Sequence, residues 1–262
     1  SRRRAAVEAA SAAAIATALS MIVFAPILKW IATGWSSGDM LSTYVNAEVW
    51  QGFTYRVTDQ FGFPLGMNLN YFPGIDITEN TFAQIVTILT GKPFVGINLL
   101  VLLTFPLVAF LAYYLFRMTG LPGALAIAGA VVFSLLPYHF GRALGHTYLS
   151  TLYSAVTGMA FVLLIGSGRF EQIIRTLRKP TTSTKTRVLT LLTLVVMAVI
   201  TAWTGVYYVA FTLILGAAEG ALKQLARVLN TSVVRGLLAV FDALPAEDAS
   251  RVGPALTWLI SP

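Results

Sequence analysis

Long apolar runs separated by short polar stretches dominate this sequence. A run of roughly 17–25 apolar residues is long enough to cross a hydrocarbon core of about 30 Å as a helix. The runs that we interpret as membrane-spanning helices cover residues 5–33, 93–116, 121–138, 149–165, 188–202 and 205–222, with a partial seventh over 236–260. The pattern predicts an all-α integral membrane protein with about seven transmembrane helices, in a single module over residues 1–262.

The C-terminal part of this pattern is interrupted. The apolar stretches 236–244 and 252–260 are each too short to cross a bilayer, and a polar sequence separates them. We expect either a seventh helix that continues beyond residue 262 or residues missing between 242 and 250. On both interpretations the C-terminal region is absent or incomplete.

A polar, aromatic-rich segment over 34–92 separates the first two predicted spans. Within it, apolar residues recur at helical spacing over 41–53, as in a short helix that lies in the membrane interface. A second amphipathic stretch, 80–90, is too short to span and ends before Gly91 and Pro93. We therefore expect two interfacial helices in this loop.

Composition agrees with a membrane protein and excludes several chemistries. Hydrophobic residues make up 56% of the chain and charged residues 11%, whereas about a quarter of the residues in a soluble domain are charged. The chain has no cysteine and two histidines, which excludes disulfides, thiolate chemistry and Cys- or His-rich metal sites. It contains no nucleotide-binding loop, Ser-His-Asp set or nucleic-acid motif, so we expect no nucleic-acid partner.

The placement of the basic residues predicts the orientation. One side holds Arg2, Arg3, Arg4, Arg117, Arg169, Arg175, Arg178, Lys179, Lys185, Arg187, Lys223, Arg227 and Arg235. The other side holds Lys29, Arg56, Lys92 and Arg142. Because Lys and Arg accumulate in cytoplasmic loops, we place the N-terminus in the cytoplasm. Asp39 and the segment 139–146 then lie on the extracytoplasmic face of the plasma membrane.

Asp39 directly follows the first predicted span. One interpretation is an N-cap, in which the carboxylate accepts hydrogen bonds from free N–H groups of a helix that begins near Met40. The other is a general base, or a carboxylate that orients an acceptor, held above the bilayer. The two roles are compatible, and we favour the catalytic one.

His139, Arg142 and His146 form a second constellation, in a short loop or helix after the third predicted span. If the segment is helical, their spacing places them on one face. A planar guanidinium fork with two imidazoles is a good donor set for a phosphate or pyrophosphate. A metal site is less favoured because no carboxylate is near in sequence. The alternative role is to anchor the helix end at lipid head groups.

Four further residues of the first outer loop are candidates for a site. Asp59, Asp76 and Glu79 are candidates for a second carboxylate, although each also fits a turn or a helix cap. Asp76 and Glu79 have the spacing of a capping box. Tyr44 is a candidate for contact with the acceptor.

An acidic residue after the first span, short interfacial helices, and basic or His residues in the second outer loop together resemble the GT-C superfamily. These are polytopic glycosyltransferases that use polyprenyl-phosphate sugars. The resemblance covers most of the chain as an architecture, but its specific residues are few: Gly38-Asp39 and the segment from Pro137-Tyr138-His139 to His146. The family shares a module of seven N-terminal helices.

The resemblance implies an inverting transfer of sugar from a polyprenyl-phosphate donor to a cell-envelope glycan, glycolipid or protein acceptor. Asp39 would be the catalytic carboxylate, and Arg142 with His139 and His146 would hold the lipid phosphate. The interfacial helices would frame a groove for the polyprenyl tail. The chain departs from the family in lacking a clear second acidic motif in the second loop. Metal dependence therefore stays open, and we expect no required metal or other cofactor.

Two alternatives come from other classes of protein. The first is a transporter or a lipid or glycolipid flippase, although the predicted spans contain almost none of the ionisable residues that coupled transport places near the bilayer midplane. The second is a non-catalytic scaffold subunit of the membrane.

Overall fold

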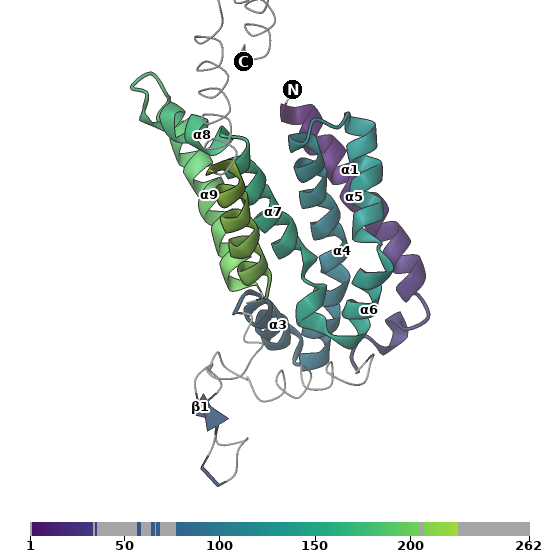
Figure 1. Cartoon of the computed structure of the whole chain (residues 1–262). Helices are drawn as coiled ribbons and strands as arrows, with labels where there is room; N and C mark the ends of the chain where they lie inside the picture. The colour runs from purple at the N-terminus through teal and green to yellow at the C-terminus, as the bar shows by residue number, and fades with distance from the viewer. Residues whose placement is uncertain are drawn as a thin grey trace, which may run out of the picture. The chain divides into compact units, whose positions relative to one another are not determined.

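The computed structural model describes residues 2–33, 35, 57–58, 64–65, 67–68, 77–204 and 207–224. The chain divides into two units, Ser1–Leu213 and Ile214–Pro262. The first unit is a helical bundle (Figure 1). The predicted helix over 41–53 lies outside the described residues.

The bundle contains eight labelled α-helices and two short 3-10 helices among the described residues. They are α1 (Arg2–Phe24), η1 (Leu28–Trp30), α3 (Ile77–Thr90), α4 (Pro93–Met118), α5 (Gly123–Ser134), α6 (Pro137–Gly145), η3 (Thr147–Ser150), α7 (Leu152–Gly166), α8 (Arg169–Arg178) and α9 (Thr184–Trp203). A further helix covers 207–224. Two short antiparallel strands, β1 (Val57–Thr58) and β2 (Met67–Asn68), pair Val57 with Asn68.

Within the described part, four helices are long and apolar enough to cross a bilayer. They cover Arg3–Phe24, Pro93–Met118, Gly123–Gly145 and Thr184–Ala202, and a fifth is reached if α7 and α8 are counted as one span bent by 78°. Apolar side chains such as Ile22 and Val195 are well exposed on these helices, as expected of surfaces that face lipid. These features support a helical membrane protein. The total of seven transmembrane helices stays a prediction, and so does the placement of the short helices in the membrane interface.

Two boundaries differ from the expected spans, each because of a proline. The first helix ends at Phe24, not at residue 33, because Pro26 has no N–H and its ring clashes with the preceding turn. The third span is divided into α5 and α6 before Pro137 for the same reason. The fourth span ends at Gly166, one residue from the expected end at 165, and Gly168 takes a left-handed φ of 69° that turns the chain into α8.

Helix α4 lies at the centre of the bundle and packs against α1, α3, α5 and α7. Ala9, Ala12 and Ala16 line the buried side of α1, so the backbones approach closely, as is common between membrane helices. The contact between α3 and α4 is closer still. A Cβ at Gly96 would lie 2.4 Å from the carbonyl oxygen of Ala83, so only glycine fits there.

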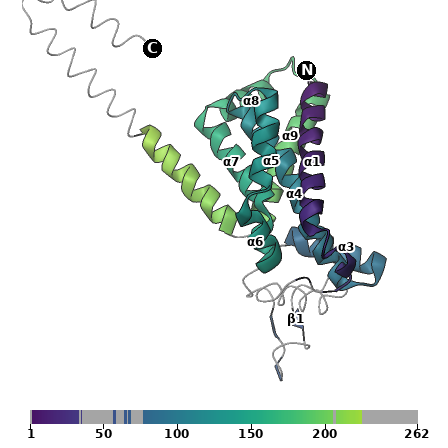
Figure 2. The same ribbon diagram turned by 90° about the vertical axis from the view of Figure 1, so that its right-hand side faces the viewer.

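The two ends of the bundle differ in chemistry. The start of α1 and the helix α8 lie at one end, which we call the α8 end, whereas α3 and α6 lie at the other, the α3–α6 end (Figures 1 and 2). Basic residues of α1, α8 and the turn before α9 gather at the α8 end. The candidate site residues that the structure describes belong to the α3–α6 end.

Candidate functional site

Helix α3 buries polar side chains at the α3–α6 end. Glu79, Asn80 and Gln84 are 1%, 2% and 4% exposed, and Ala83 on the same face is also buried. An amphipathic helix at an interface normally directs its polar face outward. Here one polar face of α3 instead lies in the interior of the protein, so this end of the bundle has a hydrogen-bonding interior.

The Glu79 carboxylate is bound by a tyrosine from a distant helix. The Tyr153 hydroxyl, at the start of α7, donates a hydrogen bond of 2.5 Å to Glu79 Oε1, and Tyr153 is 5% exposed. A buried carboxylate is stable only when hydrogen bonds replace its lost hydration. The sequence suggested Glu79 as a cap or second carboxylate and gave no reason to select Tyr153. The pair joins α3 to α7.

His139 lies fully buried between α4 and α6. Its ring stacks on Phe105 with a centroid separation of 4.0 Å. Nδ1 donates to the carbonyl oxygen of Ser134 at 2.7 Å, and Nε2 lies 2.9 Å from Thr104 Oγ1. Both ring nitrogens are therefore committed within the bundle, and His139 positions α6 rather than facing a ligand.

Arg142 and His146 lie nearer the surface than His139. Arg142 is half-buried, and its Cζ atom lies 5.1 Å from the ring centroid of Tyr138, a cation–π arrangement. His146 follows the last residue of α6 with an extended φ of −157°, so it leaves the helix. The three residues therefore do not share one helical face. Arg142 and His146 are partly exposed at the end of α6, and His139 is not.

The remaining predicted site residues, Asp39, Tyr44, Asp59 and Asp76, lie outside the described residues and stay predictions. The chain shortly before Asp39 is nevertheless fixed against α4. Asn98 Nδ2 donates to the carbonyl oxygens of Ile31 and Thr33, at 2.9 Å each.

No group of three or more His, Cys, Asp or Glu residues within the described ranges is arranged to hold a metal ion. The metal independence expected from the sequence stays a prediction.

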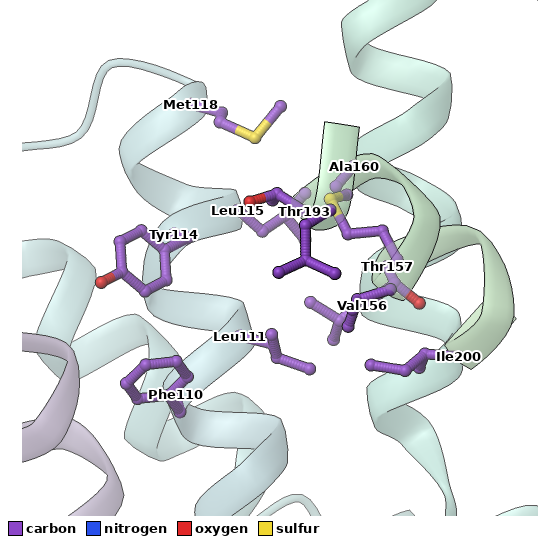
Figure 3. Close-up of a pocket in the computed structure, with 13 residues that line it drawn as sticks. Phe110, Leu111, Tyr114, Leu115, Met118, Val156, Thr157, Ala160, Thr193 and Ile200 are labelled. Carbon is purple, nitrogen blue, oxygen red and sulfur yellow. The ribbon is translucent and has the colours of Figure 1, made fainter. Parts of the chain in front are cut away.

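A separate apolar cavity of about 510 Å³ lies between α4, α7 and α9 (Figure 3). Phe110 and Leu115 of α4 line it on one side, and Val156 of α7 and Met197 of α9 line it on another. None of the predicted site residues that the structure describes lines this cavity. It has the character of a site for a hydrocarbon chain.

Comparison with known proteins adds no assignment: no family model, no curated protein and no solved structure matches this chain.

Proposed function

We propose that this chain is the membrane module of a glycosyltransferase, which moves a sugar from a polyprenyl-phosphate donor to an acceptor hydroxyl at the α3–α6 end of the bundle. The proposal rests on the charged side chains that lie at this end. A buried carboxylate, Glu79, and a half-buried guanidinium, Arg142, come from two short helices, α3 and α6, beside long apolar helices. A lipid-linked phosphate substrate requires both a cationic group and an adjoining apolar surface.

Arg142 and His146 are the groups we assign to the donor phosphate. Both are partly exposed, a guanidinium carries five N–H donors, and the guanidinium of Arg142 lies over the ring of Tyr138, near the start of α6. A positive charge there would stabilise the phosphate that departs as the sugar is transferred. His139 acts indirectly, because its bond to Thr104 holds α6 against α4 and its bond to Ser134 holds α6 against the end of α5.

Asp39 is the carboxylate that we assign to the acceptor hydroxyl, as a general base. It is six residues after Thr33, whose carbonyl oxygen Asn98 holds at the start of α4. Glu79 is a carboxylate that the structure describes at the α3–α6 end, on α3. Its burial and its bond to Tyr153 give it a positioning role, fixing α3 against α7.

We also propose how the bundle is oriented in the membrane. The basic α8 end faces the cytoplasm, and the α3–α6 end faces outward, as the positive-inside rule implies. The acceptor is then a glycan, glycolipid or protein outside the plasma membrane.

The test is sugar transfer from radiolabelled polyprenyl-phosphate sugars in membranes that contain the full-length protein. Arg142→Gln should lower transfer at least about tenfold, equivalent to about 1.4 kcal/mol of lost interaction with the phosphate. Lys92→Gln is the matched control. It removes the same charge from an exposed residue before α4 and should leave transfer within about twofold. Equal losses in both variants at equal expression would contradict the assignment of Arg142.

A further inference from the structure

The α8 end contains a cleft that is separate from the apolar cavity. This cleft, of about 410 Å³, lies between α7, α8 and α9. Its lining is mixed, because Leu164, Ile173 and Leu177 lie beside polar side chains. Arg169, Gln172 and Thr176 come from α8, and Thr186 and Thr190 come from α9.

Arg169 connects the cleft with the lining of the cavity. It lines the cleft, and its Nη1 atom donates to the carbonyl oxygen of Met118 at 3.0 Å. The side chain of Met118 lines the apolar cavity. A guanidinium carries five N–H donors, and Arg169 is exposed, so donors remain for an incoming acceptor.

The cleft and the cavity also lie along one face of α9. On α9, Thr186 and Thr190 line the cleft, whereas Thr193 and Met197 line the cavity. Intervals of four, three and four residues keep these side chains on one face of the helix. A ligand with a polar head and an apolar chain can therefore follow α9 from the cleft into the cavity.

The positive charge at the α8 end favours the binding of an anionic ligand. Between residues 169 and 187 there are six basic residues and one acidic residue, Glu171. Glu171 is paired with Arg175 at 3.2 Å, so the local excess stays positive. An anionic membrane surface attracts such a segment with about 1 kcal/mol per basic residue.

We propose that the cleft and the cavity together bind one anionic glycerophospholipid from the leaflet at the α8 end, with its phosphate at Arg169 and an acyl chain in the cavity. A free phosphate would leave the apolar cavity unfilled, and an uncharged lipid would leave the guanidinium unused. The site lies at the end of the bundle opposite to Arg142, so it is distinct from the donor site and does not depend on the proposed transfer reaction.

The test is lipid binding by the full chain in detergent, measured by native mass spectrometry. Phosphatidylglycerol and phosphatidylcholine with identical acyl chains are the two probes. Phosphatidylglycerol should bind about tenfold more tightly, and Arg169→Gln should remove this preference. Arg175→Gln is the matched control: it removes the same charge from the same helix, from a residue that does not line the cleft. Its affinity should change less than about twofold.

A second pair of variants tests the cavity without altering charge. Val196 and Val195 are adjacent on α9 and 46% and 56% exposed, so a larger side chain at either position is compatible with folding. Only Val196 lines the cavity. Val196→Trp should weaken phosphatidylglycerol binding severalfold, and Val195→Trp should not.

Three results would overturn the proposal. Equal losses in Arg169→Gln and Arg175→Gln would indicate non-specific attraction to surface charge. Displacement of the lipid by millimolar inorganic phosphate would indicate a site for a free anion. Tenfold tighter binding of a polyprenyl phosphate than of phosphatidylglycerol would assign the site to the donor lipid.

Discussion

Tyr153 donates a hydrogen bond of 2.5 Å to Glu79, a residue 74 positions earlier in the chain, and both side chains are buried. This bond joins the short helix α3 to the start of α7. The bond therefore holds α3 in place at the α3–α6 end.

Tyr153→Phe should lower the free energy of unfolding by about 1.5–3 kcal/mol, because it removes a hydrogen bond to a charged group and leaves a buried carboxylate without that donor. Tyr114→Phe is the control, since Tyr114 is 36% exposed on α4, and it should change stability by less than about 0.5 kcal/mol. Unfolding in mixed micelles measures both. A double variant with Glu79→Gln that showed no coupling to Tyr153→Phe would contradict the importance of this bond.

Gly96→Ala should destabilise the protein by about 1–3 kcal/mol. The new methyl group would lie 2.4 Å from the carbonyl oxygen of Ala83, so α3 would have to move away from α4. Gly141→Ala is the matched control in α6. A Cβ there meets no atom within 4 Å, and the change should be neutral or stabilising by up to about 1 kcal/mol. Equal thermal stability of the two variants would show that α3 does not pack closely on α4.

His139 and Arg142 should behave oppositely although they are three residues apart. His139→Ala should lower stability by about 2–4 kcal/mol, because it removes the stacking on Phe105 and two buried hydrogen bonds. Arg142→Ala should leave stability within about 1 kcal/mol and abolish most of the transfer activity. Thermal unfolding and transfer are measured on the same preparations. A His139→Ala variant that was stable but inactive would instead show that His139 contacts the substrate.

The positions of the apolar helices were largely predictable from the sequence, because length and hydrophobicity alone identify a span. The ends of these helices were less predictable. Pro26 and Pro137 are visible in the sequence, but an apolar run continues through both, and apolarity does not distinguish a helix from the turn that follows it. The end of α1 at Phe24 and the break before α6 depend on proline geometry rather than on hydropathy.

The candidate site was less predictable, since its buried groups pair over long distances. The pattern of α3 correctly indicates a helix, but it does not indicate that Glu79, Asn80 and Gln84 are buried or that Glu79 pairs with a residue 74 positions along the chain. No local signal selects Tyr153 as the partner. In the same way, the spacing of His139, Arg142 and His146 suggested one common face, which the end of α6 at Gly145 prevents.

The central claim, that the Asp39 carboxylate catalyses sugar transfer, is tested most directly by the Asp39→Asn variant of the full-length protein. Its transfer from a radiolabelled polyprenyl-phosphate sugar is compared with wild type at equal expression. The proposal predicts that transfer falls at least about a hundredfold, as expected on loss of a general base, while thermal stability decreases by no more than about 2 kcal/mol from a lost helix cap. Unchanged transfer in Asp39→Asn would remove this carboxylate from the mechanism and contradict the proposed function of the site.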